Sequence, residues 1–144
     1  MNKSYYVDTC IWLNLFKKEG DAGKGVPYWK LARDFIDKVA ESNGKIIVST
    51  IILKELSFTI SNKFSVISNF FKTSDYIEII KTSNEDYNFA RELERTEKIK
   101  LSFYDYLHIA IAKRLNVPLV IRDNDLILVA KKHIQVSKPE DLIS

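Results

Sequence analysis

The stretch YDYLHIAIAKRLNVPLVIRDND, residues 104–125, holds the pattern that decides the fold. Its first part belongs to an apolar segment with helical periodicity, which predicts a helix over residues 101–116. The run PLVIR that follows is an apolar segment of the kind found in strands that are buried on both faces of a parallel sheet. A helix that leads into such a strand is the repeating unit of α/β proteins.

The same alternation of strands and helices extends through the rest of the chain. Further strand patterns occupy residues 4–7, 45–49, 75–81 and 134–138. Helical patterns occupy residues 10–17, 28–42, 51–60, 62–71, 82–98 and 125–133. Thr50 is the expected N-cap of the third helix, and a glycine-rich loop over residues 17–27 joins the first two. The sequence therefore predicts an α/β fold, a three-layer α/β/α sandwich with a mainly parallel central sheet, formed by one domain over residues 1–144.

Length and composition fit a soluble folded domain. Of the 144 residues, 46% are hydrophobic and 28% are charged, which argues against disorder. No apolar run reaches the roughly 20 residues that span a bilayer, and the N-terminus lacks the features of a secretory signal. We therefore expect a cytoplasmic protein without a membrane partner. The net charge of +3 is compatible with a nucleic-acid partner. The single cysteine, Cys10, excludes an internal disulfide, and a buried thiol is expected there.

Three aspartates follow strands of the predicted sheet. Asp8 comes directly after the strand at residues 4–7. Asp123 follows the strand that ends at Arg122, and Asp125 lies two positions further on. In open parallel sheets, ligands bind in the crevice beyond the C-terminal ends of the strands. These carboxylates are therefore candidates for a functional site.

Two further acids lie in helices, on faces that are otherwise apolar. On a helical projection, the side of Glu55 is shared by Ile51, Ile52, Phe58 and Thr59. The face of Asp105 is shared by Ile109 and Ala112. Burying a carboxylate is costly unless a cation or strong hydrogen bonds compensate for it. We expect both acids to point inward, towards such partners.

Each of these acids also has a purely structural interpretation. Asp8 lies where an aspartate caps a helix, and Asp105 completes a Ser-x-x-Asp capping box. Asp123 and Asp125 flank an asparagine in a turn, where aspartate is frequent. Glu55 has the weakest structural explanation, because nothing requires a mid-helix glutamate to share an apolar face. Two acids at strand ends and two on inward helix faces together favour a site.

A divalent cation is what such a group of carboxylates needs, because clustered carboxylates repel one another and raise each other's pKa. The chain has no His/Cys cluster, so an all-oxygen site suits Mg²⁺ or Mn²⁺ rather than zinc. Such an ion can activate a water molecule and stabilise the leaving oxygen in phosphodiester hydrolysis. The acids together therefore predict metal-dependent cleavage of a nucleic acid.

Three segments resemble the PIN-domain nucleases, a family that includes the VapC-type toxins of toxin–antitoxin pairs. They are YYVDTCIWL at residues 5–13, ILKEL at residues 52–56 and the stretch at residues 104–125. The resemblance implies that the catalytic and metal-binding residues are Asp8, Glu55, Asp105 and Asp123. It further implies Asp125 as an outer metal-binding acid and Thr9 as a hydroxyl beside the first aspartate. Mg²⁺- or Mn²⁺-dependent endoribonuclease activity on RNA, a homodimer and an antitoxin partner are likewise implied by the resemblance.

One position departs from the family pattern. Many members carry Thr or Ser two residues before the fourth acid, where this chain has Ile121, so either Asp123 or Asp125 completes the site. The same departure favours an alternative function, a non-catalytic module that binds RNA or protein. A third candidate, an aspartate-based phosphotransferase or receiver-like domain, is disfavoured because Asp8 is followed by Thr9 and Cys10. The strand at residues 45–49 also ends without the acid that a receiver needs.

His108 lies one helical turn after Asp105. A contact with a phosphate or a part in proton transfer is conceivable for this imidazole. We expect instead a polar exit from the helix and assign it no catalytic role.

Overall fold

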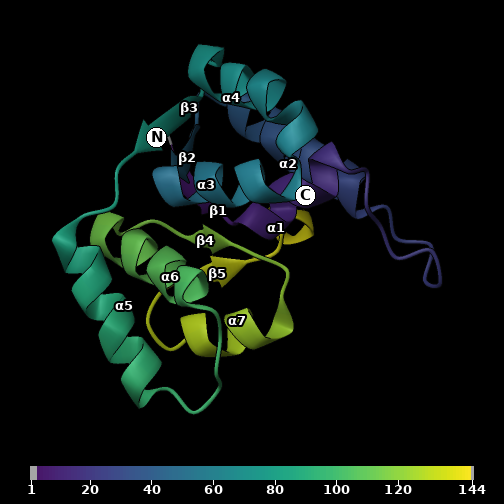
Figure 1. Ribbon diagram of the computed structural model, residues 1–144. Helices are drawn as coiled ribbons and strands as arrows, with labels where there is room; N and C mark the ends of the chain where they lie inside the picture. Colours follow the sequence, from purple (N-terminus) through teal and green to yellow (C-terminus); the bar gives the residue numbers. More distant parts are fainter. Residues whose placement is uncertain (1–2, 144) are drawn as a thin grey trace.

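Five parallel strands form the central sheet of the computed structural model, which describes residues 3–143 (Figure 1). The strands are β1 (Ser4–Val7), β2 (Lys45–Ser49), β3 (Ile77–Ile80), β4 (Leu119–Val120) and β5 (Val136–Ser137). Their spatial order is β3-β2-β1-β4-β5, and each described neighbouring pair is parallel. The predicted sheet is therefore confirmed, with the first strand of the chain at its centre.

Helices cover the sheet in two groups. Within residues 3–143 they are α1 (Thr9–Phe16), α2 (Tyr28–Glu41), α3 (Thr50–Thr59), α4 (Phe64–Thr73), α5 (Asn84–Thr96), α6 (Phe103–Leu115) and α7 (Asn124–Ala130), with short 3-10 helices at Ser61–Lys63 and Pro139–Leu142. In Figure 1, α2, α3 and α4 gather beside β2 and β3, and α5, α6 and α7 gather beside β4 and β5. Parallel crossovers are right-handed, so connections that run towards opposite edges of the sheet lie on opposite faces. The result is the expected three-layer sandwich.

Burial of apolar side chains explains why these segments form these elements. Every residue of β2 after Lys45 is buried, as the apolar run predicts. The buried residues of α2 recur at helical spacing along one stripe. Helix α6 is buried at every position from 106 to 112, because it packs against both α5 and β4. No helix within residues 3–143 combines the length and the apolar character that crossing a membrane requires.

Two helix caps show where local sequence rules succeed and fail. The expected capping residue of α3 was Thr50, but Ser49 is the N-cap, and its Oγ accepts a hydrogen bond from Ile52 N–H at 3.3 Å. The prediction was one residue late because β2 runs straight into α3 and the chain turns at Ser49. At α5, the sequence offers Thr82 and Ser83, followed by Glu85 and Asp86, as the start of a helix, and Ser83 and Asp86 form the complete capping box.

The last two strands are shorter than their apolar patterns. Each pairs over two residues, whereas the sequence predicts five. Single hydrogen bonds extend the pairing beyond the strands: Asp8 N–H donates to Val120 O, and Ile121 N–H donates to Ser137 O, both at 3.0 Å. Regular pairing then ends because Asp123 begins α7.

The predicted loop at residues 17–27 is confirmed and forms a small arm. An antiparallel bridge joins Asp21 to Val26, and Gly25 has the positive φ of 67° that the tight turn between them requires. The arm projects from the body of the molecule at the right of Figure 1. The arm joins the end of α1 to the start of α2.

Candidate active site

Asp8 lies where the strand order of the sheet reverses. It follows β1, and β4 pairs with β1 on the side opposite to β2. Chain connections leave this point towards both edges, which opens a crevice between the C-terminal ends of β1 and β4. The side chain is 4% exposed and caps α1, with Oδ2 accepting a hydrogen bond from Cys10 N–H at 3.2 Å. The capping interpretation of Asp8 is therefore correct. Its other oxygen, Oδ1, lies 3.7 Å from His108 Nε2.

Glu55 reaches this crevice from the middle of α3. Its Oε1 accepts hydrogen bonds from Thr9 Oγ1 at 2.7 Å and from His108 Nε2 at 2.6 Å. The side chain is 21% exposed, so it is sheltered but open to the crevice. The expected strong hydrogen bonds for an inward-facing Glu55 are thus present.

The apolar face predicted around Glu55 is only half correct. Ile51 and Ile52 are buried, whereas Phe58 is 72% exposed and Thr59 is also exposed. These last two residues belong to the final turn of α3, and no neighbouring element in the described part of the chain covers their side chains, although Leu56 in the same turn is buried. The helical projection could not reveal this, because it gives the direction of a side chain but not the extent of the neighbouring elements.

His108 is fully buried, so the expectation that it is a polar exit from α6 was wrong. Its Nδ1 contacts Tyr6 Oη at 2.7 Å, and Tyr6 Oη contacts Ser49 Oγ at 2.7 Å. Burial alone lowers the pKa of the imidazole. The hydrogen bond to Glu55 and the negative charge of Asp8 outweigh burial, and the net pKa of His108 is raised. The apolar residues on all sides of α6 were the signal that could have shown its burial.

Asp105 enters the crevice from the first turn of α6. Its backbone N–H donates to Ser102 Oγ at 3.2 Å, so the cap predicted from the spacing exists. The carboxyl is half-buried, and its pKa is raised to about 6. Burial is the main cause, and the negative charges of Asp8 and Glu55 add to it, while His108 acts in the opposite direction. Three acids from distant parts of the sequence therefore lie within electrostatic reach of one another.

Asp123 and Asp125 lie on the neighbouring rim and are exposed. Asp123 caps α7, with Oδ1 accepting from Asp125 N–H at 2.9 Å and from Leu126 N–H at 3.1 Å. The structural interpretation of this turn is thus correct. The charges that act on Asp105 are chiefly those of Asp8, His108 and Glu55, whereas Asp123 and Asp125 line the neighbouring cavity.

Cys10 lies between the two groups of acids. Burial raises the pKa of its thiol, the charge of Asp8 raises it further, and backbone groups of Arg122 and Asp123 oppose the rise. The side chain is partly exposed rather than fully buried, because it lines a cavity. A thiol with a raised pKa is a poor nucleophile.

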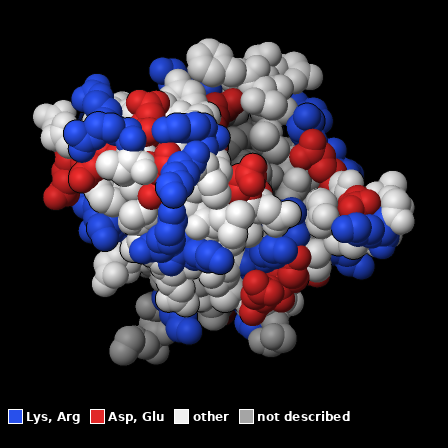
Figure 2. All heavy atoms as spheres, turned by 90° about the horizontal axis from the view of Figure 1, so that it is seen from below, with Lys and Arg blue, Asp and Glu red and all other residues white. Residues whose placement is uncertain are grey.

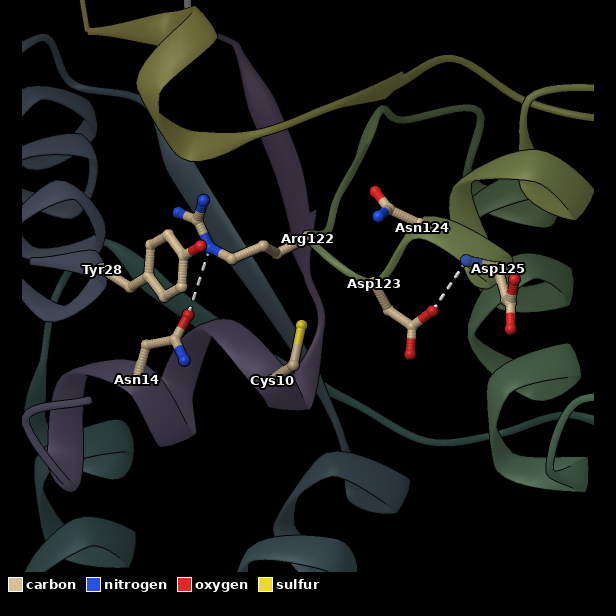
Figure 3. Close-up of a pocket in the computed structure, with 7 residues that line it drawn as sticks. All are labelled: Cys10, Asn14, Tyr28, Arg122, Asp123, Asn124 and Asp125. Carbon is tan, nitrogen blue, oxygen red and sulfur yellow. Dashed lines mark hydrogen bonds between the residues drawn. The ribbon is translucent and has the colours of Figure 1, made fainter. Parts of the chain in front are cut away.

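The cavity beside Asp123 has a volume of about 580 Å³ (Figure 3). Its lining residues are Cys10, Asn14, Tyr28, Arg122, Asp123, Asn124 and Asp125. Figure 3 shows Asn14 and Tyr28 on one side of the cavity and Asp123, Asn124 and Asp125 on the other. The cavity is therefore continuous with the acidic rim.

Arg122 forms the wall of this cavity, which sequence reasoning missed. Its guanidinium donates two hydrogen bonds to Glu140, each 2.8 Å long, and lies 4.0 Å over the ring of Tyr28. Its Nε also contacts Asn14 Oδ1 at 3.4 Å. The guanidinium is thus neutralised and held in place, and the end of β4 is tied to α1, α2 and the last 3-10 helix.

The donor chemistry of the acids fits a hard divalent cation. Among residues 3–143, no three His, Cys, Asp or Glu side chains stand close enough to hold a metal ion as they lie. Burial is the main cause of the raised pKa of Asp105, and the charges of Asp8 and Glu55 add to it, so a bound cation would offset the part that comes from these two carboxylates. Carboxylate oxygens are the donors that Mg²⁺ and Mn²⁺ prefer.

Basic side chains gather near the lower edge of the molecule. Figure 2 shows them as a band beside separate acidic side chains on the face seen from below. The end of α5, the loop after it and the end of α7 lie at the bottom of Figure 1. In residues 95–102 and 131–133, the exposed basic residues are Arg95, Lys98, Lys100, Lys131 and Lys132, of which Lys132 forms an ion pair with Glu97. A band of this kind suits a polyanion.

The sequence matches one family model, described as the PIN domain, over residues 5–132. Among curated proteins, none matches the chain.

Several solved structures share the fold at low sequence identity. VapBC2 from Rickettsia felis, bound to a DNA fragment from its promoter, matches with a TM-score of 0.69 and 18% identity over 94% of this chain and 98% of that chain. FitAcB from Neisseria gonorrhoeae matches with a TM-score of 0.66 and 16% identity over 94% and 97% of the two chains. VapC20 from Mycobacterium tuberculosis, a Sarcin-Ricin loop cleaving toxin, matches with a TM-score of 0.63 and 20% identity over 86% and 93%. At these identities the similarity is one of fold.

Proposed function

This chain belongs to the PIN-domain family, and from that premise we propose that it is a Mg²⁺- or Mn²⁺-dependent endoribonuclease, the toxin of a toxin–antitoxin pair. The observation that carries the proposal is the convergence of Asp8, Glu55 and Asp105 at the switch point of the sheet. Asp8 follows β1, Glu55 lies on α3 and Asp105 on α6, and the charges of the first two add to burial in raising the pKa of Asp105 to about 6. Carboxyl groups with perturbed pKa values cluster at functional sites, and a bound divalent cation would compensate the charges gathered here.

We assign the metal to Asp8, Glu55 and Asp105, with Asp123 as the fourth ligand and Asp125 as an outer acid. When bound, the metal would supply an activated water and stabilise the leaving oxygen of a phosphodiester. The protein's own part is to hold the carboxylates in place. Thr9 donates to Glu55, and Asp8 is fixed by its cap on α1. Capping leaves Oδ2 of Asp123 available, because its two backbone hydrogen bonds both go to Oδ1.

RNA is the proposed substrate. The exposed lysines at the ends of α5 and α7 would contact the backbone of a nucleic acid through charge. The cavity beside Asp123 offers space for a nucleotide next to the scissile phosphate. VapC20 is described as a Sarcin-Ricin loop cleaving toxin, and we extend RNA cleavage, but not that target, to this chain.

We further propose a homodimer, an antitoxin partner and a cytoplasmic site of action. Phe58 and Val66 are exposed large apolar side chains on α3 and α4, with exposed fractions of 72% and 74%. Side chains of this kind are commonly covered by a partner protein. We also regard residues 1–144 as one functional domain, since the family match spans most of them.

A non-catalytic module that binds RNA or protein is the second candidate. Ile121 favours it, because this fully buried apolar side chain stands where many family members have a hydroxyl. In this case the crevice would keep its shape but would not support turnover.

One experiment separates the two candidates. Labelled RNA of mixed sequence is incubated with wild type, Asp8→Asn or Asp37→Asn, in Mn²⁺, Mg²⁺ or chelator. Asparagine caps a helix as well as aspartate does, so Asp8→Asn should fold, and Asp37 is an exposed acid of α2. We expect metal-dependent cleavage by wild type and Asp37→Asn and none by Asp8→Asn. Bound but uncleaved RNA with all three proteins would support the binding module instead.

A further inference from the structure

A chain of buried polar side chains lies behind the Glu55 carboxylate. Ser49 Oγ contacts Tyr6 Oη at 2.7 Å, and Tyr6 Oη contacts His108 Nδ1 at 2.7 Å. His108 Nε2 then contacts Glu55 Oε1 at 2.6 Å. Ser49, Tyr6 and His108 are each fully buried. These hydrogen bonds lead from Ser49 on β2 through Tyr6 on β1 to His108 on α6 and end at Glu55 on α3. The network therefore joins four elements at the edge of the crevice.

The Glu55 carboxylate fixes the direction of the hydrogen bond nearest to it. An ionised carboxylate only accepts, so His108 Nε2–H donates to Glu55 whether the imidazole is neutral or protonated. The two bonds behind it follow the charge of His108. A neutral imidazole accepts at Nδ1 from Tyr6 Oη–H, whereas a protonated one donates from Nδ1 to Tyr6 Oη, which then donates to Ser49 Oγ. Each polar side-chain atom of Ser49, Tyr6 and His108 has a hydrogen-bond partner. A buried polar network holds its members rigidly under this condition.

Glu55 is oriented by this arrangement. Its Oε1 accepts two hydrogen bonds, from His108 and from Thr9, which approach from different elements. Its Oε2 has no hydrogen-bond partner among the described residues and is therefore the oxygen available to a ligand. Two donors on one oxygen fix the rotation of the carboxylate more firmly than either donor alone.

We propose that His108 is a positioning residue that sets the orientation of Glu55, and that Tyr6 and Ser49 hold the imidazole in the donating orientation from behind. The assignment rests on the proposed metal site in one respect only, that Glu55 is one of its ligands. His108 itself contacts neither metal nor RNA in this scheme.

Two substitutions of His108 test its two hydrogen bonds separately, because each variant keeps a different one of them. The amide nitrogen of Gln lies near the place of the imidazole Nε2, so His108→Gln keeps a donor for Glu55. The shorter Asn places its amide near the Nδ1 position, so His108→Asn keeps a partner for Tyr6 and loses the bond to Glu55. Both variants keep a polar side chain at a buried position, which makes them a matched pair.

The first readout is Mn²⁺ affinity, measured by electron paramagnetic resonance without RNA. Loss of a group that orients a ligand typically weakens metal binding by about 10–100-fold. We expect a loss in this range for His108→Asn and a change of less than about 3-fold for His108→Gln. Equal affinities for the two variants would overturn the proposal.

A second pair keeps the test decisive where His108→Asn fails to fold. Tyr6→Phe removes the hydroxyl behind His108 at nearly constant volume, and Thr9→Val removes the other donor to Glu55. We expect both to weaken Mn²⁺ binding while leaving the far-ultraviolet circular dichroism unchanged. Unchanged Mn²⁺ affinity in folded Tyr6→Phe would equally contradict the positioning role.

Cleavage of RNA is scored separately. If wild type binds Mn²⁺, responds to His108→Asn and cleaves no RNA, the proposed ribonuclease fails while the positioning role stands. If wild type cleaves RNA and His108→Asn does so with the same metal dependence, the positioning role fails while the ribonuclease stands.

Discussion

Arg114 and Asp86 form a bidentate ion pair that joins α6 to α5. The guanidinium donates to both carboxylate oxygens, at 2.8 and 2.9 Å, and the Asp86 side chain is fully buried. Asp86 also closes the capping box of α5 by accepting from Ser83 N–H at 2.9 Å. The Asp86 carboxylate thus both caps the start of α5 and links α5 to α6. The Arg114 guanidinium compensates its negative charge.

Removing the cation from this pair should destabilise the fold without touching the crevice. We expect Arg114→Ala to lower the free energy of unfolding by about 3 kcal/mol, because it leaves a buried carboxylate uncompensated. The exposed neighbour Lys113→Ala is the control and should change it by less than about 0.5 kcal/mol. Urea denaturation provides the measurement, and a similar small loss in both variants would refute the expectation.

The raised pKa of Asp105 predicts how stability depends on pH in the absence of metal. The folded protein holds the proton up to about pH 6, whereas an unfolded aspartate releases it near about pH 3.9. The stability that this group contributes is complete at low pH and is lost as the pH rises through about 6. We expect Asp105→Asn to be more stable than wild type at pH 7 and equal to it near pH 4. Urea midpoints at both pH values in chelator test this, with Asp37→Asn as the control that should show no such crossover.

Addition of Mn²⁺ should stabilise the folded protein through the same acids. At a free metal concentration 100 times the dissociation constant, the gain is about 2.7 kcal/mol. We expect this gain in wild type and its loss in Asp8→Asn and Glu55→Gln, measured as the shift of the thermal midpoint on metal addition. An undiminished shift in both variants would mean that the metal binds elsewhere.

Substitutions of Asp123 and of Asp125 should differ in how much they reduce the shift of the thermal midpoint on Mn²⁺ addition. Asp123 follows β4 after Ile121 and Arg122, and both of its backbone hydrogen bonds go to Oδ1, whereas Asp125 lies in the first turn of α7. We expect Asp123→Asn to reduce the Mn²⁺-dependent shift more than Asp125→Asn does. The reverse order would assign Asp125 as the fourth ligand.

Replacement of Arg122 should loosen the cavity wall. A lysine keeps the charge but cannot donate two parallel hydrogen bonds to Glu140 or stack as a plane on Tyr28. We expect Arg122→Lys to cost about 1–2 kcal/mol of unfolding free energy. A double-mutant cycle with Glu140→Gln measures the coupling, and additive losses would show that the pair contributes nothing.

The sequence predicted those features that depend on local periodicity. The apolar runs at β2 and β4, the stripe of α2 and the capping box at Ser83 all depend on near neighbours, and the structure confirms each of them. The alternation of strands and helices then restricts the topology, and with it the place where Asp8 and Asp123 emerge.

Contacts between residues that are far apart in the sequence could not be predicted from local sequence patterns. His108 pairs with Tyr6 across 102 positions and with Glu55 across 53, so no local pattern could show that its helix face is closed. Arg122 looked like the end of a strand, and only the fold brings Glu140 and Tyr28 to it. The prediction that Phe58 lies on a buried face was wrong for the opposite reason. Its helix face is apolar there, but no neighbouring element in the described part of the chain covers the Phe58 side chain.

The central place of β1 has a consequence for synthesis on the ribosome. This strand is made first, yet its partner β4 lies more than a hundred residues later, and Asp123 emerges only after it. A nascent chain that extends only through α6 leaves one edge of β1 unpaired and lacks Asp123. The site therefore cannot be completed until α6, β4 and Asp123 have been translated, so a chain released from the ribosome before that point would lack the proposed fourth ligand.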